Sequence, residues 1–146
     1  MKPGTINATN WAALVLRLVI CGVFIYAGWE KLGAPGQFAD SIAAYRLLPL
    51  NWVNPMALAL PPLELITGCL LLAGWQLRAA TFSALILSGL FAIALGSALW
   101  RGLAIDCGCF GAETVPGGNL RIALLRDLLL VAASLFIYAR ELFKAL

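Results

Sequence analysis

The sequence contains no histidine and has few charged residues. Lysine, arginine, aspartate and glutamate make up 12% of its 146 residues, whereas about 25% is usual for a soluble domain. Without histidine the chain lacks the commonest general base, so a hydrolase or transferase of the usual triad kind finds no support. The scarcity of charge leaves too little polar surface to cover a water-soluble fold. Both absences therefore argue against the water-soluble enzyme classes.

A cluster of basic residues is also missing. Ten basic and seven acidic residues give a formal net charge of +3, and they are scattered along the chain without a run. Nucleic-acid binding requires basic residues gathered on one face or in one segment. We therefore expect no nucleic-acid partner.

Apolar residues are abundant, at 62% of the chain. They fall into four blocks, at about 11–32, 52–75, 79–100 and 120–143, and a helix that crosses a bilayer needs about 20 largely apolar residues. Tryptophan has an amphipathic ring, which prefers the level of the lipid headgroups. All five tryptophans lie at the ends of these blocks: Trp11, Trp29, Trp52, Trp75 and Trp100. Arg17 interrupts the first block, so we expect a retained helix rather than a cleaved signal peptide.

The segment between the first and second blocks is more than a linker. Residues 37–48 place Phe38, Ile42 and Tyr45 at helical spacing, and Pro49 ends the pattern. A short helix on the membrane surface fits this spacing best. The sequence therefore predicts an all-α fold: an integral membrane four-helix bundle in one domain, residues 1–146, with a short interfacial helix between the first two membrane helices.

The four cysteines divide into two kinds. Cys21 and Cys69 lie inside predicted membrane helices, where a thiol packs as a small apolar side chain, so we expect a structural role for both. Cys107 and Cys109 flank Gly108 in the third connection between blocks, residues 101–119.

A disulfide between residues two apart can form but is strained, because their Cα atoms are about 5.5–7 Å apart, the upper edge of what the bond tolerates. A strained, exposed disulfide is of the labile or catalytic kind, and it closes too small a loop to stabilise the fold much. We favour a redox-active pair. A structural or intermolecular disulfide and a metal site remain as alternatives; two thiolates cannot complete a zinc site, which leaves copper(I) or a metal shared with a partner.

Charged residues surround this pair in the sequence. Arg101 and Arg121 flank the connection, and Asp106 directly precedes Cys107. The two arginines would lower the pKa of a nearby thiol, and the positive end of the predicted fourth helix, near Asn119, would lower it further. Such surroundings favour the thiolate form. We count these residues as candidate supports of the cysteine chemistry.

A second group of charges lies within the predicted membrane helices: Arg17, Glu64, Arg126 and Asp127. Charges at such depth are rare and normally face the bundle interior in pairs. One interpretation is a buried ion pair of Glu64 with Arg17 or Arg126 that holds the helices in register. The other is a proton path, or the polar end of a quinone or thiol site beneath the loop; the cofactor stays unassigned.

Four runs along the chain form a recognisable set. In order, they are Gly28-Trp29-Glu30-Lys31-Leu32, Tyr45-Arg46-Leu47-Leu48-Pro49, Leu60-Pro61-Pro62-Leu63-Glu64 and Asp106-Cys107-Gly108-Cys109-Phe110-Gly111. Together they resemble the MauE branch of the DoxX-like membrane proteins. The resemblance implies a four-helix membrane protein that assists disulfide formation or thiol handling in periplasmic proteins; MauE is associated with maturation of methylamine dehydrogenase alongside a thioredoxin-like partner. The corresponding motif residues are Cys107, Cys109 and Glu64.

The sequence therefore predicts a membrane thiol–disulfide redox protein, oxidoreductase in class. Its Cys107–Cys109 pair would exchange disulfides with a periplasmic thioredoxin-like partner or a secreted disulfide-containing client. Two other classes stay open: a protein that binds or transports copper(I) through the same cysteines, and an assembly subunit with no chemistry of its own.

Basic residues alone do not decide the orientation in the membrane. Four flank each side, with Lys2, Arg78, Arg140 and Lys144 on one side and Lys31, Arg46, Arg101 and Arg121 on the other. Disulfide chemistry belongs in an oxidising compartment. We therefore predict a bacterial inner-membrane protein with both termini cytoplasmic and the cysteine loop periplasmic.

Overall fold

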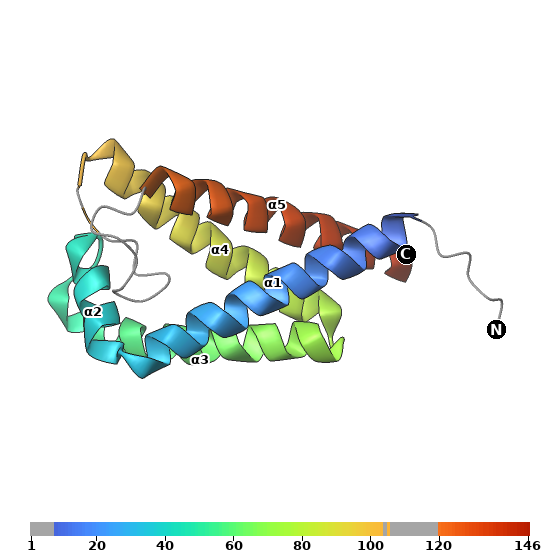
Figure 1. Ribbon diagram of the computed structural model, residues 1–146, viewed down its shortest axis with the longest axis horizontal. Helices are drawn as coiled ribbons and strands as arrows, with labels where there is room; N and C mark the ends of the chain where they lie inside the picture. The colour runs from blue at the N-terminus through green and yellow to red at the C-terminus, as the bar shows by residue number, and fades with distance from the viewer. Residues whose placement is uncertain (1–7, 104, 106–119) are drawn as a thin grey trace.

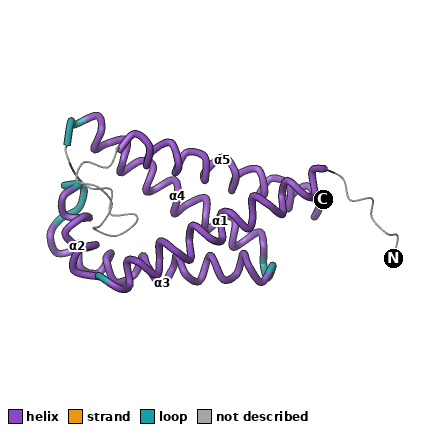
Figure 2. Tube along the Cα trace, viewed as in Figure 1, coloured by secondary structure: helices purple, strands orange, loops and turns teal. Residues whose placement is uncertain are grey.

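A computed structural model describes residues 8–103, 105 and 120–146. In these residues it has five helices and no strand (Figures 1 and 2): α1 (Ala8–Gly33), α2 (Pro35–Ala44), α3 (Leu50–Ala73), α4 (Leu77–Trp100) and α5 (Leu120–Ala145). Four of them, α1, α3, α4 and α5, are long and apolar enough to cross a membrane. The predicted fold class is confirmed, and the chain is a multi-pass membrane protein. Asp106, Cys107 and Cys109 lie outside the described residues.

The turn between α3 and α4 is as short as the sequence suggests. Gly74 ends α3 in the left-handed conformation, with φ of 72°, which glycine adopts without steric cost. The amides of Gly74 and Trp75 both donate to the Leu70 carbonyl oxygen. Gln76 is also left-handed, with φ of 47°, and α4 begins at the next residue.

Helix α2 is confirmed as a helix but ends earlier than predicted. It stops at Ala44 rather than at residue 48, because Arg46 takes a left-handed conformation with φ of 51°, which a right-handed helix cannot continue. Phe38 and Tyr45 are buried, and α2 packs mainly on α3. Its expected position on the membrane surface stays a prediction.

The four long helices pack mainly as two pairs, α1 with α3 and α4 with α5. The pairs converge toward the end that carries the α3–α4 turn and diverge toward the end where α2 lies (Figure 1). A hydrogen bond of 2.9 Å between the hydroxyls of Thr67 and Ser83 joins α3 to α4. The rings of Phe82 and Tyr138, with centroids 5.8 Å apart, join α4 to α5.

Two glycines bring the backbones of α1 and α3 close together. A Cβ added at Gly28 would lie 3.0 Å from the carbonyl oxygen of Pro61, and one added at Gly68 would lie 3.3 Å from the carbonyl oxygen of Cys21. Small residues at such crossings are the usual way for membrane helices to pack tightly. Helix α3 continues unbroken through Pro61 and Pro62, so it presents one continuous face to α1.

The two cysteines of the membrane helices differ in their surroundings. Cys21 is buried in the core beside Ile20 and Phe24, as expected. Cys69 is exposed, contrary to the expectation that it packs in the bundle. The reason is helical geometry: Gly68 faces α1 and Leu71 is fully buried, and Cys69, one position after Gly68 and two before Leu71, is turned away from that face.

The outer surface of the bundle is apolar, as a bilayer requires. All five tryptophans are exposed near helix ends, from Trp11 at 56% to Trp100 at 93%. Their positions agree with the predicted role as anchors at the headgroup level.

Replacing Gly28 by alanine should destabilise the bundle, because the new Cβ would lie 2.9 Å from Leu65 Cγ and 3.0 Å from the Pro61 carbonyl oxygen. Overpacking of this kind typically costs about 1–3 kcal/mol. Thermal unfolding of the purified protein in detergent measures the loss. Gly22→Ala is the matched control, since nothing lies within 4 Å of a Cβ there. Equal Tm values for the two variants would contradict the close packing of α1 on α3.

Candidate functional site

A buried ion pair joins the end of α1 to the middle of α3. Lys31 Nζ lies 2.7 Å from Oε1 and 2.9 Å from Oε2 of Glu64, and each side chain is only 3% exposed. Burying two charges is costly unless both are paired and hydrogen-bonded. The ammonium here donates to both oxygens of the carboxylate, so each charge has its partner within the bundle.

This pair corrects the expectation that Glu64 pairs with Arg17 or Arg126. From its place in the sequence Lys31 is expected among the residues flanking the membrane, whereas the structure buries it. The physical reason is the rotation of α1: Phe24, Ala27 and Lys31 follow one another at helical spacing on the buried face. That spacing is the signal in the sequence that identifies Lys31 as an inward-facing residue.

Two aromatic rings complete the surroundings of the lysine. Lys31 Nζ lies 4.3 Å from the ring centroid of Phe91 on α4 and 5.0 Å from that of Phe38 on α2. A cation over an aromatic face within about 6 Å is attracted by the electron-rich ring. The lysine therefore links four helices, namely its own α1, α3 through Glu64, α4 through Phe91 and α2 through Phe38.

A second charged pair lies on α5. Arg126 Nε and Nη2 donate to Oδ1 of Asp127 at 3.1 and 3.0 Å. The other carboxylate oxygen, Asp127 Oδ2, is buried and accepts no hydrogen bond from the described residues. Asp127 is 4% exposed, so this oxygen is an acceptor held in the interior with no donor among the described residues.

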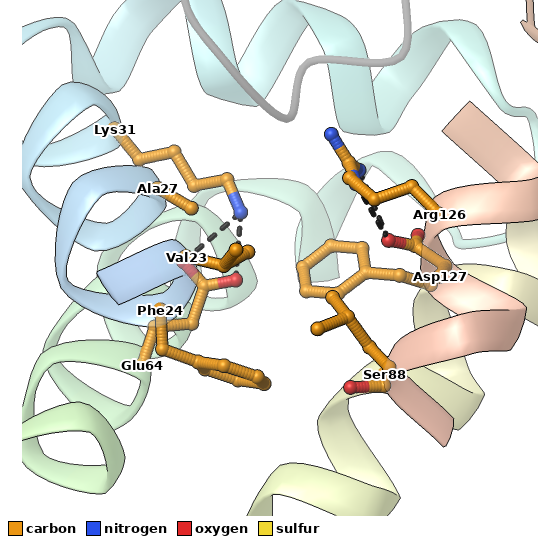
Figure 3. A pocket seen from close by; sticks show the side chains of 10 residues that line it. Val23, Phe24, Ala27, Lys31, Glu64, Ser88, Arg126 and Asp127 are labelled. Carbon is orange, nitrogen blue, oxygen red and sulfur yellow. Dashed lines mark hydrogen bonds and ion pairs between the residues drawn. The ribbon is translucent and has the colours of Figure 1, made fainter. Parts of the chain in front are cut away.

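The two pairs face one cavity between the four long helices (Figure 3). It is lined by Val23, Phe24, Ala27 and Lys31 of α1, Glu64 of α3, Ser88 and Phe91 of α4, and Arg126, Asp127 and Leu130 of α5. The Ser88 hydroxyl is also buried without a partner among the described residues. The cavity volume is about 30 Å³, enough for one or two water molecules and well below the roughly 150 Å³ of a cavity that binds benzene. The cavity thus suits water rather than a quinone ring.

The charges of this cluster balance. Lys31 and Arg126 carry two positive charges, and Glu64 and Asp127 carry two negative ones. A neutral total is the least costly way to keep ionised groups in a medium of low dielectric constant. Asp127 Oδ2 and the Ser88 hydroxyl have no hydrogen-bond partner among the described residues and face the cavity, where a small polar molecule can bind them.

The structure brings together three of the residues selected from the sequence: Glu64, Arg126 and Asp127. Two others lie elsewhere. Arg101 is exposed and donates to the carbonyl oxygens of Tyr45 and Ser97, and Arg121 is exposed on the first turn of α5.

Arg17 lies toward the opposite end of the bundle, near Gly74, which is why it cannot reach Glu64. The three loop residues of the predicted site, Asp106, Cys107 and Cys109, fall outside the described residues. Ser88 and Phe91 also line the cavity but were not predicted, because a serine or phenylalanine in an apolar helix carries no distinguishing signal in the sequence.

Fold and site together define a class: a multi-pass membrane protein of four long helices with a buried, charge-balanced cluster toward the end that bears α2. The chain belongs to the MauE family. Residues 9–140 match the family described as "Methylamine utilisation protein MauE". The chain is 34% identical over 131 residues to the methylamine utilization protein MauE of Methylophilus methylotrophus, covering 87% of this chain and 67% of that protein. No solved structure matches. The MauE resemblance seen in the sequence is confirmed.

Breaking the Lys31–Glu64 pair from one side should be far worse than removing both charges. Lys31→Met or Glu64→Gln leaves one buried charge unpaired, which costs about 3–5 kcal/mol. The Lys31→Met/Glu64→Gln double variant should recover most of that stability, and unfolding of the purified variants in detergent gives the coupling energy.

Lys144→Met provides the control, because it breaks the exposed Lys144–Glu141 pair, in which the lysine side chain is 55% exposed. A loss of about 0–1 kcal/mol is expected there. A double variant no more stable than the single ones would show that the Lys31–Glu64 coupling is not what holds α1 on α3.

Proposed function

We propose that this protein exchanges disulfides through Cys107 and Cys109 with a periplasmic thioredoxin-like protein or a secreted disulfide-containing client. Its role would be the maturation of a protein used in methylamine utilisation. Membership of the MauE family and the name of the M. methylotrophus relative support this role. The Cys-Gly-Cys spacing supports the chemistry, because a strained disulfide is readily exchanged.

The exchange needs no oxidant or reductant besides the two proteins, because one disulfide is broken for each disulfide formed. One loop thiolate attacks a sulfur of the partner disulfide, which forms a mixed disulfide and releases the other partner sulfur as a thiolate that takes up a proton. The second loop cysteine, after losing its proton, attacks the mixed disulfide and releases the first partner sulfur. The loop ends as a disulfide and the partner as a dithiol, and the same steps run in reverse when the loop is the oxidant.

The residues on either side of the cysteine segment are the observation that supports this proposal. Leu103 donates its amide to the Ala98 carbonyl oxygen at the end of α4, and Arg101 binds the backbone of Tyr45 beside α2. Leu120 is buried where α5 begins. The segment between them is therefore attached at both ends to the bundle end toward which the Lys31–Glu64 cluster lies.

We assign a supporting role to Glu64, Arg126 and Asp127: they keep a polar interior of fixed geometry toward the bundle end where α4 ends and α5 begins. The Lys31→Met/Glu64→Gln variant, already described for stability, also tests this role when its rate of disulfide exchange is measured. If the charges support the thiolates, the variant recovers stability yet exchanges disulfides more slowly.

The orientation with both termini in the cytoplasm gains support from the burial of Lys31. Once Lys31 is a partner of Glu64 rather than a flanking residue, three basic residues remain at the loop side, against the four at the other side named above. An excess of basic residues marks the cytoplasmic side. The cysteine loop then faces the periplasm of a bacterial inner membrane.

Substituting one loop cysteine should trap the partner. With Cys109→Ser, the mixed disulfide through Cys107 cannot be resolved, so a larger species should appear on non-reducing gels of alkylated cells and vanish on reduction. The reciprocal Cys107→Ser variant tests attack through Cys109. Cys69→Ser is the matched control because that thiol is exposed but lies in α3.

Two results would overturn redox exchange. The first is full activity with no trapped partner from either variant. The second is stoichiometric copper in protein purified under reducing conditions that is lost in the Cys107→Ser/Cys109→Ser variant, which would identify a copper(I) protein.

Labelling in whole cells tests the orientation. In a Cys21→Ser/Cys69→Ser background, a membrane-impermeant maleimide should label Cys107 after mild reduction, and a tag after Leu146 should be protected from external protease. The opposite pattern of labelling and protection would place the loop in the cytoplasm.

A further inference from the structure

A second, larger cavity lies at the end of the bundle away from the cysteine segment. Its volume is about 450 Å³, and it lies between the first turns of α1 and the last turns of α5, with Leu77 at the start of α4 also in its wall. Its polar lining consists of Asn10, Arg17, Arg140, Glu141 and Lys144. This site is distinct from the charge-balanced cluster, because the two cavities share no residue.

The charge of this cavity is not balanced. Three basic side chains face one acidic side chain, and Lys144 Nζ lies 2.7 Å from the Glu141 carboxylate. Arg140 donates to the side-chain oxygen of Asn10, which is neutral. The lining therefore has an excess of two positive charges, carried by Arg17 and Arg140.

Arg17 carries one of these two positive charges and has no counter-ion among the described residues. It lies ten residues into an apolar membrane helix, forms no ion pair with the described residues, and its buried Nε has no hydrogen-bond partner there. A guanidinium does not lose its proton in proteins, so it cannot become neutral as a buried lysine can. Its positive charge therefore has no counter-ion among the described residues and is available to an anion from outside them.

The level of the cavity indicates where that anion comes from. Arg17 Nη1 would lie 3.6 Å from a Cβ added at Gly74, so its guanidinium is level with the α3–α4 turn. Trp75 in that turn and Trp11 on α1 are both exposed, as residues at the headgroup level are. Leu14, also in the cavity wall, is exposed. The cavity wall is therefore open to the apolar surface that lipid would cover, at the height expected for lipid phosphate groups.

We propose that this cavity binds the phosphate group of an anionic phospholipid. The planar guanidinium of Arg17 would donate two parallel hydrogen bonds to phosphate oxygens, and Arg140 would supply the second positive charge. Basic pockets between membrane helices bind lipid headgroups in this way. The apolar wall formed by Leu14, Leu77 and Ile137 accommodates the glycerol backbone and the first methylenes of a lipid, which free phosphate lacks.

Lipid titration of the full-length protein in a zwitterionic detergent tests this site, with bound lipid counted by native mass spectrometry and Tm measured in parallel. Dioleoylphosphatidylglycerol should bind and raise Tm, whereas dioleoylphosphatidylcholine and inorganic phosphate should not. Arg17→Gln and Arg140→Gln should each weaken phosphatidylglycerol binding about fivefold, as expected for one basic residue. Arg46→Gln, an exposed arginine beyond α2 at the other end, should bind as the unmodified protein does.

Unchanged phosphatidylglycerol binding in both Arg17→Gln and Arg140→Gln would overturn the site. Equal stabilisation by inorganic phosphate would overturn the lipid as its ligand. If Arg17→Gln fails to fold, the Arg140→Gln variant decides alone, because the side-chain hydrogen bond that Arg140 donates within the described residues goes to Asn10, at the ends of the helices.

Discussion

The pairing of Lys31 with Glu64 is the constraint on which the rest of the bundle depends. Neither charge can remain in an apolar interior without the other, so α1 and α3 must present these two residues to each other. Gly28 and Gly68 allow the two backbones to come close enough for the contact. Phe38 and Phe91 then cover the lysine from α2 and α4, which orients those helices as well.

The two ends of the molecule differ in their electrostatics. Toward the end that bears α2 and the cysteine segment, the buried charges cancel and leave Asp127 Oδ2 and the Ser88 hydroxyl facing a water-sized cavity. At the other end, Arg17 and Arg140 face a much larger cavity with positive charge in excess. A neutral polar interior suits chemistry at a fixed site, whereas uncompensated positive charge at the headgroup level suits attachment to lipid.

Much of the fold and part of the site could be predicted from single residues and their spacing. The long helices stand out because each apolar block matches the bilayer thickness, and Glu64 and Asp127 stand out because deep charges are rare. The end of α2 could not be predicted, since the left-handed Arg46 has no sequence signature comparable to that of a glycine. The predicted partner of Glu64 was wrong. Lys31 lies two residues from the end of α1, so it resembles a flanking residue until the rotation of that helix is known.

The amino-acid sequence alone is enough to identify the lipid bilayer as the surroundings of this protein, its four membrane helices, its family and the Cys-Gly-Cys pair between the last two helices. All of these follow from composition and from patterns local to the chain. Tertiary structure brings Lys31 to Glu64 and leaves Arg17 without an ion pair among the described residues, whereas Arg126 and Asp127 are neighbours on one helix. The reason is geometric, because a side chain's partner depends on how each helix is rotated and on which helix packs beside it, and long-range packing sets both.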